Sequence, residues 1–408
     1  MASKSYQVLL AGSAAANDFY SDLASLRMEE RNGEASRCEM QLSIRLKDNG
    51  SWTYLDDDNL ALFTKLSVQI GFTSGGGLAA APGGALGSGD SNAGMATIFD
   101  GYITGVEMQL GSDAGSAFLK VTGMDTSVLM SLEEKIASWP NMADSDIAQQ
   151  IIGGYGATPQ TDTTTPVHQD TDTTILQRGS DLQFVRDLAE KNGFEFYFET
   201  DASSGTVTAY FQAPQLTGTP QPDLAINAGA QSNLKSFSAR MTGLRPLNVK
   251  IVQLDVSADS PNTGQASSTS LKELGASDAG MLVGGPLGSL VRPQDAPAQM
   301  LLTAPPTSDA TELQNIAQAV RDEAGWFITA QGEISSDAYQ AVLRPHRLVL
   351  VKGAGKSFSG KYYVTAVAHE VKADGSYTQK FEAVRNARDL DGSEQFGSSG
   401  QGVALPSV

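Results

Sequence analysis

Phe99-Asp-Gly-Tyr-Ile-Thr-Gly-Val106 and Phe358-Ser-Gly-Lys-Tyr-Tyr-Val-Thr-Ala-Val367 are two versions of one short pattern, near opposite ends of the chain. Both read Phe-x-Gly, then a β-branched residue, Thr, a small residue and Val, and the second version carries two extra residues. Each version lies between two strand-like apolar runs: Leu66–Phe72 and Phe118–Met124 for the first, Arg347–Val351 and Tyr377–Val384 for the second. A repeat of strand order as well as residues predicts one small β-domain used twice.

Two similar domains in one chain gain a purpose in an oligomer. Three chains would place six such domains around one axis, so a trimer would match a sixfold ring. Gly101 and Gly360 are expected where a strand bends or bulges to close a small barrel. Phe99 and Phe358 are expected to fill the two barrel interiors. The repeat also shares two threonines, Thr104 and Thr365.

The size and composition indicate a folded protein of several domains. The chain has 408 residues, enough for two to four domains, and 40% of them are hydrophobic. The single cysteine, Cys38, lies in an alternating run, which predicts a core-facing strand residue. A catalytic thiol is the alternative, and the core position is favoured. One cysteine cannot form an internal disulfide, so folding does not depend on an oxidising compartment.

The formal net charge of −18 argues against a sequence-independent DNA binder, because phosphate contacts need clustered lysine and arginine. Solubility is the favoured explanation of the acidity, and an acidic lumen or a surface for a basic partner is the alternative. The sequence shows no signal peptide and no apolar run near the roughly 20 residues that span a bilayer. Synthesis and first assembly in the cytoplasm are therefore expected, without membrane insertion.

The order of patterns along the chain predicts a mainly β protein with short helices, an α+β fold of two related β-barrels and a central region. The expected boundaries are 1–125 for the first barrel, 126–235 for the central α+β region, 236–390 for the second barrel and 391–408 for a flexible tail. Gly-rich insertions are expected at 73–95 in the first barrel and at 257–306 in the second.

Cap signals place three helices. Asp144-Ser145-Asp146 begins one that ends at Gly153-Gly154, and Ser308 or Asp309 begins another that ends at Gly325. Ser180 caps the third, with Gln183 in the capping-box position, and Gly193 ends it. Its apolar residues, including Phe184, Val185 and Leu188, are expected to bury against Phe194, Phe196 and Phe198. The run from Phe194 to Glu199 predicts a strand, with Val207–Phe211 as its hairpin partner.

No motif in the sequence nominates a catalytic, cofactor or metal site. No Gly-x-Ser-x-Gly elbow, phosphate-binding loop or dinucleotide fingerprint is present. His369-Glu370 begins like a zinc helix, but Ala373 stands where the second histidine would be, so a structural histidine is favoured. His168, Asp170 and Asp172 form a weak candidate for a cation. We therefore expect no cofactor and no enzyme, although 46 acidic residues always leave a paired-carboxylate site open.

The middle and the end of the chain resemble hub proteins of contractile injection machines, namely the phage late control D family and the N-terminal half of VgrG proteins. Three pieces carry the resemblance: Val121–Asp125 followed by the helix at 145–152, then Gln177–Phe194 with Ser180, Asp181, Phe184 and Gly193, then Phe358–His369. It extends from about residue 5 to residue 388. Each piece is weak alone, and their order is specific.

The resemblance implies a homotrimer in which each chain supplies two related β-barrels to a pseudo-sixfold ring. A hexameric inner tube or tube initiator would build on this baseplate hub, a trimeric spike would attach below, and other baseplate proteins would surround it. Fused hub–spike proteins continue into long repeats that this chain lacks, so a separate spike is expected, and no lysozyme-like domain is inserted. Synthesis in a bacterial cytoplasm and a place in a phage tail or an extracellular injection particle would follow.

Two other functions stay open on the sequence alone. One is a tail-tip hydrolase of polysaccharide or peptidoglycan, hidden in the Gly-rich insertions. The other is a carbohydrate-binding protein on a particle surface. The repeat and the helix after Ser180 favour the structural hub over both.

Overall fold

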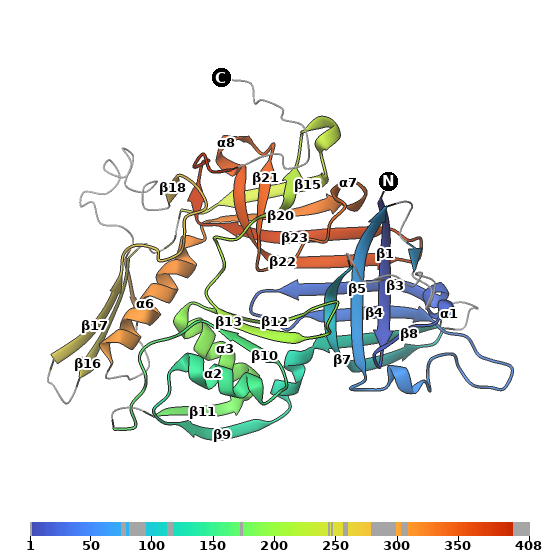
Figure 1. The fold of residues 1–408 in the computed structure, drawn as a ribbon, viewed down its shortest axis with the longest axis horizontal. Coiled ribbons are helices and arrows are strands. Elements are labelled where there is room, and N and C mark those ends of the chain that lie inside the picture. The colour runs from blue at the N-terminus through green and yellow to red at the C-terminus, as the bar shows by residue number, and fades with distance from the viewer. Residues whose placement is uncertain are drawn as a thin grey trace.

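The fold is taken from a computed structural model that describes residues 2–74, 79–80, 95–111, 117–171, 174–243, 245, 248–255, 260–278, 299–302 and 309–394. Strands dominate it (Figure 1). A single 14-stranded sheet takes strands from both ends of the chain, in the order β15-β20-β23-β22-β3-β4-β8-β7-β5-β1-β2. β6 joins it beside β1, and β21 and β14 join it beside β22.

The first half of this sheet comes from the N-terminal part of the chain. Its strands alternate buried apolar and exposed polar residues, as in β4, where Cys38, Met40 and Leu42 are buried. Its elements are β1 (Ala2–Leu10), β2 (Ser13–Ala14), α1 (Asn17–Asp22), β3 (Leu23–Arg31), β4 (Arg37–Ser43), η1 (Asp58–Leu60), β5 (Lys65–Ser74), β6 (Ala79–Ala80), β7 (Met95–Gln109) and β8 (Phe118–Asp125).

The second half follows the central region. Its elements are β14 (Gln221–Ala225), η3 (Gly229–Gln231), β15 (Leu234–Met241), β20 (Ile328–Ser335), α7 (Ser336–Tyr339), β21 (Leu348–Lys352), α8 (Gly355–Phe358), β22 (Gly360–Lys372), β23 (Tyr377–Arg385) and β24 (Ala387–Arg388), which pairs with β18 (Ser277–Asp278). Between β15 and β20 the chain makes a separate layer of β16 (Asn248–Asp255), β17 (Ser260–Ala266), β19 (Gln299–Leu302) and α6 (Ala310–Gly325).

Five strands of each half correspond one to one. The order β3-β4-β8-β7-β5 matches β15-β20-β23-β22-β21, with every neighbouring pair antiparallel and the same order along the chain. The register also skips one residue at equivalent places: Ala24 on β3 and Lys235 on β15, then Thr104 on β7 and Thr365 on β22. A β-bulge is a specific local irregularity, so two matching bulges make the repeat a structural one.

The likeness ends at the next strand. β1 runs antiparallel to β5, whereas β14 runs parallel to β21. The halves also differ between their first two strands, where the short turn after β3 corresponds to the whole β16–α6 layer. That layer spans the insertion expected at 257–306, of which 257–259, 279–298 and 303–306 lie outside the described residues.

The central region lies beside the sheet and has its own core (Figure 1). It holds η2 (Thr126–Ser131), β9 (Glu134–Trp139), α2 (Asp144–Gly153), β10 (Thr158–Thr161), β11 (Ile175–Ser180), α3 (Asp181–Asn192), β12 (Glu195–Thr200) and β13 (Val207–Gln212). The predicted helices and the hairpin of β12 with β13 are confirmed. Phe184, Val185 and Leu188 share one core with Phe196, and Phe194 and Phe198 pack against it, as predicted.

The caps of α3 differ from the prediction in one detail. Ser180 Oγ accepts a hydrogen bond from the Gln183 amide at 3.3 Å, and Gly193 ends the helix with a φ of 67°. The Gln183 side-chain amide donates to Asp187 at 2.6 Å, and its oxygen does not accept from the Ser180 backbone N–H, so only half of the capping box forms. Asp309, by contrast, caps α6 as predicted, since its side chain accepts from the Thr311 amide.

The mainly β fold with a central α+β region is confirmed, but the expected pair of separate barrels is not what the strands make. Within the described residues neither half closes into a ring of paired strands. The reason is that β3 gives its outer edge to β22 of the other half, from Arg31 opposite Ala366 to Ser25 opposite Lys372. The two halves are therefore parts of one sheet. β14, expected in the central region, pairs within the second half, and the domain boundaries themselves stay a prediction.

Candidate assembly site

One face of the shared sheet is polar along both halves. Its opposite face carries the two large cores, so the side chains that point away from them alternate with buried apolar residues. Direct cross-strand neighbours place cations and carboxylates in near-equal number on this polar face: Arg27, Arg31, Arg37, Lys120, Arg240, Lys372 and Lys380 against Glu29, Glu39, Glu107, Glu333, Glu370 and Glu382. The acidic excess of the chain therefore lies elsewhere.

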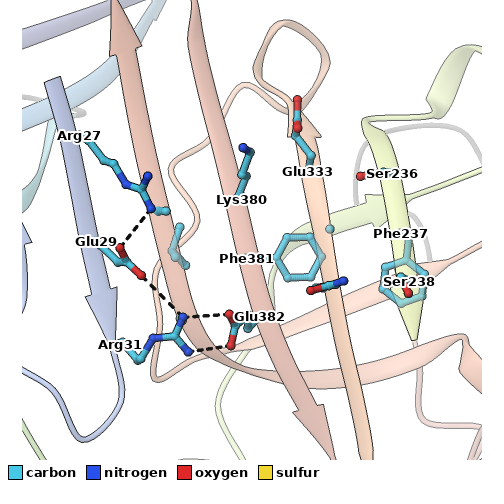
Figure 2. Close-up of a pocket in the computed structure, with 15 residues that line it drawn as sticks. Arg27, Glu29, Arg31, Ser236, Phe237, Ser238, Glu333, Lys380, Phe381 and Glu382 are labelled. Carbon is cyan, nitrogen blue, oxygen red and sulfur yellow. Dashed lines mark hydrogen bonds and ion pairs between the residues drawn. The ribbon is translucent and has the colours of Figure 1, made fainter. Parts of the chain in front are cut away.

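The polar face is hollowed where the halves meet. The hollow is lined from β3, β22, β23, β20 and β15, so it crosses from one half to the other (Figure 2). Arg31 and Glu382 form an ion pair in the hollow. Nη1 and Nη2 of Arg31 lie 2.7 and 2.8 Å from the two carboxylate oxygens of Glu382 (Figure 2). The hydrogen bonds from Arg31 hold the pKa of Glu382 below its usual value. The pair ties β3 of the first half to β23 of the second.

Glu195 joins the three parts of the molecule. This carboxylate at the start of β12 is buried and accepts hydrogen bonds from Asn32 Nδ2 at 2.6 Å, His346 Nδ1 at 2.9 Å and Tyr363 Oη at 2.5 Å. Asn32 follows β3, whereas His346 and Tyr363 belong to the second half. The His346 ring also stacks on Tyr197, with 3.6 Å between ring centroids. One buried acid thus positions both halves against the central region.

Two arginines reinforce this junction. Arg344 contacts the buried carboxylate of Glu30 on β3 at 2.9 Å and also donates to the carbonyl of Thr97 on β7. Burial raises the pKa of Glu30, and the Arg344 charge opposes that rise. Arg347 makes a two-pronged pair with Glu199 on β12 at 2.8 and 2.9 Å. The segment before β21 is therefore tied to the first half and to the central region.

The repeat glycines lie where neighbouring strands approach too closely for a side chain. A Cβ on Gly101 would lie 2.0 Å from the Met124 carbonyl oxygen. Gly360, with a φ of 133°, has the Arg385 guanidinium 2.6 Å from the position of a Cβ. The bulges that we expected at the glycines lie later in each strand, at Thr104 and Thr365. The glycines allow close packing, and the threonines mark the change of pairing.

The two phenylalanines of the repeat pack on the cores of their own halves. Phe99 is buried in the first core, and Phe358 packs half-buried against the second.

Asp125, at the end of β8, is buried and accepts hydrogen bonds from the Ser36 amide at 2.5 Å and the Ser127 amide at 2.9 Å. Burial raises the pKa of Asp125. Asp125 therefore holds the start of η2, the first element of the central region, against the segment before β4.

Asp181, the first residue of α3, holds the two-stranded sheet of β9 and β11 against the helix. It accepts hydrogen bonds from Lys135 Nζ at 2.7 Å, Tyr155 Oη at 2.6 Å and Gln177 Nε2 at 2.6 Å. Burial alone would raise its pKa, but these donors hold the pKa of Asp181 below its usual value. Every contact of Asp181 is structural.

The titratable residues singled out from the sequence are also engaged in packing. His369 is buried, and burial lowers its pKa to about 3, while its Nδ1 lies 2.7 Å from Tyr377 Oη. His168 lies 3.3 Å from the Asp144 carboxylate, and Asp172 of the candidate cation site lies outside the described residues. Cys38 is buried in the first core, which raises its pKa. Across the described ranges, no three His, Cys, Asp or Glu side chains come together as metal ligands.

The residues of the Glu195 junction were missed by sequence reasoning. The run from Phe194 to Glu199 predicts a strand but does not mark Glu195 as a junction. Arg347 is only the first residue of a strand-like run, and Arg344 belongs to no motif. Their partners are more than 140 residues away along the chain, so no spacing could show the pairing.

No helix in the described part of the chain is both long and apolar enough to cross a bilayer.

Solved structures with similar folds are tail and secretion proteins. The 43 kDa tail protein of prophage MuSo2 from Shewanella oneidensis has a TM-score of 0.62 at 12% identity, over 95% of this chain and 100% of that one. A tail protein from Neisseria meningitidis MC58 has a TM-score of 0.60 at 11% identity, over 94% and 97%. A type VI secretion component from E. coli has a TM-score of 0.50 at 15% identity, over 89% and 73%. This chain therefore has the fold of phage tail and VgrG-type hub proteins.

Sequence comparison adds a family. Among curated proteins, none matches the chain in sequence. The family model described as the Alg8 N-terminal domain matches residues 87–373, which is well over half of the chain and includes both strands of the repeat. The chain belongs to the Alg8 N-terminal domain family.

Proposed function

We propose that this chain is a structural baseplate hub of a contractile injection machine, in a phage tail or an extracellular injection particle. Three copies form a ring that adapts a trimeric spike, a separate protein, to a hexameric inner tube. The hub acts by geometry and performs no chemistry. The fold it shares with tail proteins and a type VI secretion component supports this role.

The observation that carries the proposal is the one-to-one match of five strands in the two halves, with bulges at the same two places. Two equivalent units in one chain become six in a trimer, and six units offer similar contacts to each subunit of a sixfold ring. The central region and the β16–α6 layer occur once per chain, so they would repeat only three times. One assembly then presents both symmetries.

The polar face of the sheet would line the central channel of this ring. The hollow shared by both halves lies on that face. The two large cores lie on the opposite face of the sheet and would be outside the channel. Because cations and carboxylates balance on the polar face, such a channel is not acidic, in contrast to the alternative raised by the net charge. Paired charges would leave few unpaired charged groups in the channel that could bind cargo.

The mass of the full-length chain in solution, alone and with its spike, tests the proposal. We expect a trimer, or a trimer formed when the spike is added, and electron microscopy should show a ring with six similar lobes. A ring of any other order would overturn the adapter. A zymogram with peptidoglycan and a glycan-binding assay test the hydrolase and carbohydrate-binding alternatives, and activity in either would contradict a purely structural role.

A further inference from the structure

The end of β7 beyond its bulge has an open edge. β5 pairs with β7 only as far as Lys65 opposite Tyr102, and no described strand continues beside residues 105–109 on that side. Val106, Met108 and Leu110 are 40%, 43% and 48% exposed there. An unpaired edge with a row of exposed apolar side chains is a strand-pairing site unless something covers it.

The equivalent edge in the second half is covered. Beyond the bulge at Thr365, β22 pairs along its outer edge with β3 of the first half. The residues that correspond to the exposed row on β7 are Val367, His369 and Val371, and they are 0%, 0% and 1% exposed. The difference between the two halves is therefore the presence of a neighbouring strand.

The strand equivalent to β3 is β15. Among the described residues, β15 is the terminal strand of the sheet and pairs only with β20, so no described strand lies along its outer edge. It carries its bulge at the same position as β3, so residue-by-residue equivalence is defined, with Leu26 matching Phe237 and Glu30 matching Met241. Within one chain six strands of the sheet lie between β15 and β7 in the strand order, so these two strands do not pair.

We propose that the open edge of β7 pairs with β15 of a second copy of this chain. Transferring the register of β22 with β3 sets Val106 opposite Met241, Glu107 opposite Arg240, Met108 opposite Ala239 and Leu110 opposite Phe237. The inference rests on the proposed trimeric hub and names its subunit interface. Repeated three times, it joins six half-sheets into one continuous ring of strands, in which the open edge of β7 and the outer edge of β15 are paired.

The side chains fit the transferred register. Met241, Ala239 and Phe237 are half-buried and pack against the second core, so the exposed row on β7 would extend that core. Glu107 and Arg240 carry opposite charges on the polar face, as Glu370 and Arg27 do two residues further along the β22–β3 pairing within the chain. In this register apolar side chains lie opposite apolar side chains, and the Glu107 carboxylate lies opposite the Arg240 guanidinium.

Cysteine pairs in the full-length chain test the register directly. Opposed residues on antiparallel strands lie within the separation that a disulfide spans. Val106→Cys with Met241→Cys should give a covalent trimer under mild oxidation on a non-reducing gel. Met108→Cys with Met241→Cys, displaced by two residues, is the matched control. Equal or faster cross-linking of the control would overturn the register, and Cys38 does not interfere because it is buried.

Charge reversal tests the contact without a cross-link. Glu107→Arg or Arg240→Glu should lower the trimer fraction about tenfold or more, because like charges then face each other, and the double variant should restore it. Ile136→Asp, at an exposed apolar position on β9 that is 87% exposed, is the control for Met108→Asp and should leave assembly unchanged. Urea midpoints equal to that of the parent chain show that each variant folds.

The outcomes separate this interface from the proposed function. A trimer that survives both Met108→Asp and Glu107→Arg overturns the strand pairing and leaves the hub standing with another interface. A chain that stays monomeric with spike and tube proteins present overturns the hub and the pairing together.

Discussion

Replacing Glu195 by alanine should loosen the junction between the two halves and the central region. The carboxylate is buried and has three donors, of which Tyr363 and His346 are buried with it and Asn32 is half-buried. The alanine variant leaves the phenol and the imidazole without an acceptor in a dry environment. Asn32 can turn toward solvent, so its loss counts for less.

The expected size of the effect follows from those two donors. A buried donor left without a partner costs about 1–3 kcal/mol, and breaking a buried charged network costs about 3–5 kcal/mol. We expect a loss of about 3–5 kcal/mol in the free energy of unfolding for Glu195→Ala, and about 1–3 kcal/mol for Tyr363→Phe. The matched control is Glu39→Ala, whose carboxylate is half-exposed and pairs with Lys120, where about 0.5 kcal/mol is expected.

Tryptophan fluorescence during urea unfolding can follow the parts of the molecule separately. Trp52 packs on the first core, Trp139 on the central core, and Trp326 stacks on Tyr363 with 5.9 Å between ring centroids. Single-tryptophan versions of Glu195→Ala should lose their common midpoint. A variant that unfolds with the parent midpoint, or no earlier than Glu39→Ala, would refute the role of Glu195 as a junction.

Four further outcomes follow from the packing and the charges. Gly101→Ala forces a Cβ against the Met124 carbonyl and should cost about 3 kcal/mol or more in urea unfolding. Glu382→Gln should cost about 0.5 kcal/mol at pH 7 after solvent screening, and this cost should vanish as the pH falls below the usual carboxyl pKa, because the folded-state pKa is lowered. His369 has its pKa lowered from 6.5 to about 3, so its contribution to stability is present above pH 6.5 and lost as the pH falls toward 3; His369→Gln should flatten that part of the stability profile. Phe358→Ala should stop tube nucleation by the assembled hub, seen by electron microscopy.

Each of these has a contrary result. Gly101→Ala with the parent midpoint would mean that β7 and β8 separate at no cost. A Glu382→Gln effect that persists at pH 3, or an acid limb unchanged in His369→Gln, would remove the electrostatic argument. Particles with tubes of normal length in Phe358→Ala would reject its part in nucleation.

A sheet shared between the halves has a consequence for assembly. In the described part of the chain, the open end of β7 and the outer edge of β15 belong to the same pseudo-symmetric set as the closed pair of β22 and β3. Unpaired edges of this kind lead to uncontrolled association unless a partner closes them. Closure by identical copies satisfies the edge of every subunit, which is why a ring is favoured over an open chain.

The sequence alone determined the local elements. Strand alternation around Cys38, the caps of α3 and α6, and the hairpin of β12 and β13 depend on residues a few positions apart, where side-chain periodicity and backbone caps act directly. The repeat around Phe99 and Phe358 was equally readable, because the same strand order recurs with the same residues. These signals were sufficient for a mainly β fold built on one repeated unit.

Only the tertiary structure decided how the repeated units combine. Strands pair through backbone hydrogen bonds that almost any residue can make. The residues of β3 and β22 therefore do not indicate that these two strands pair and join the halves into one sheet, instead of closing two barrels. The same holds for Glu195, whose three donors come from distant parts of the chain and meet only after folding. Long-range pairing and burial are properties of the assembled fold, because they depend on which surfaces meet rather than on local residue order.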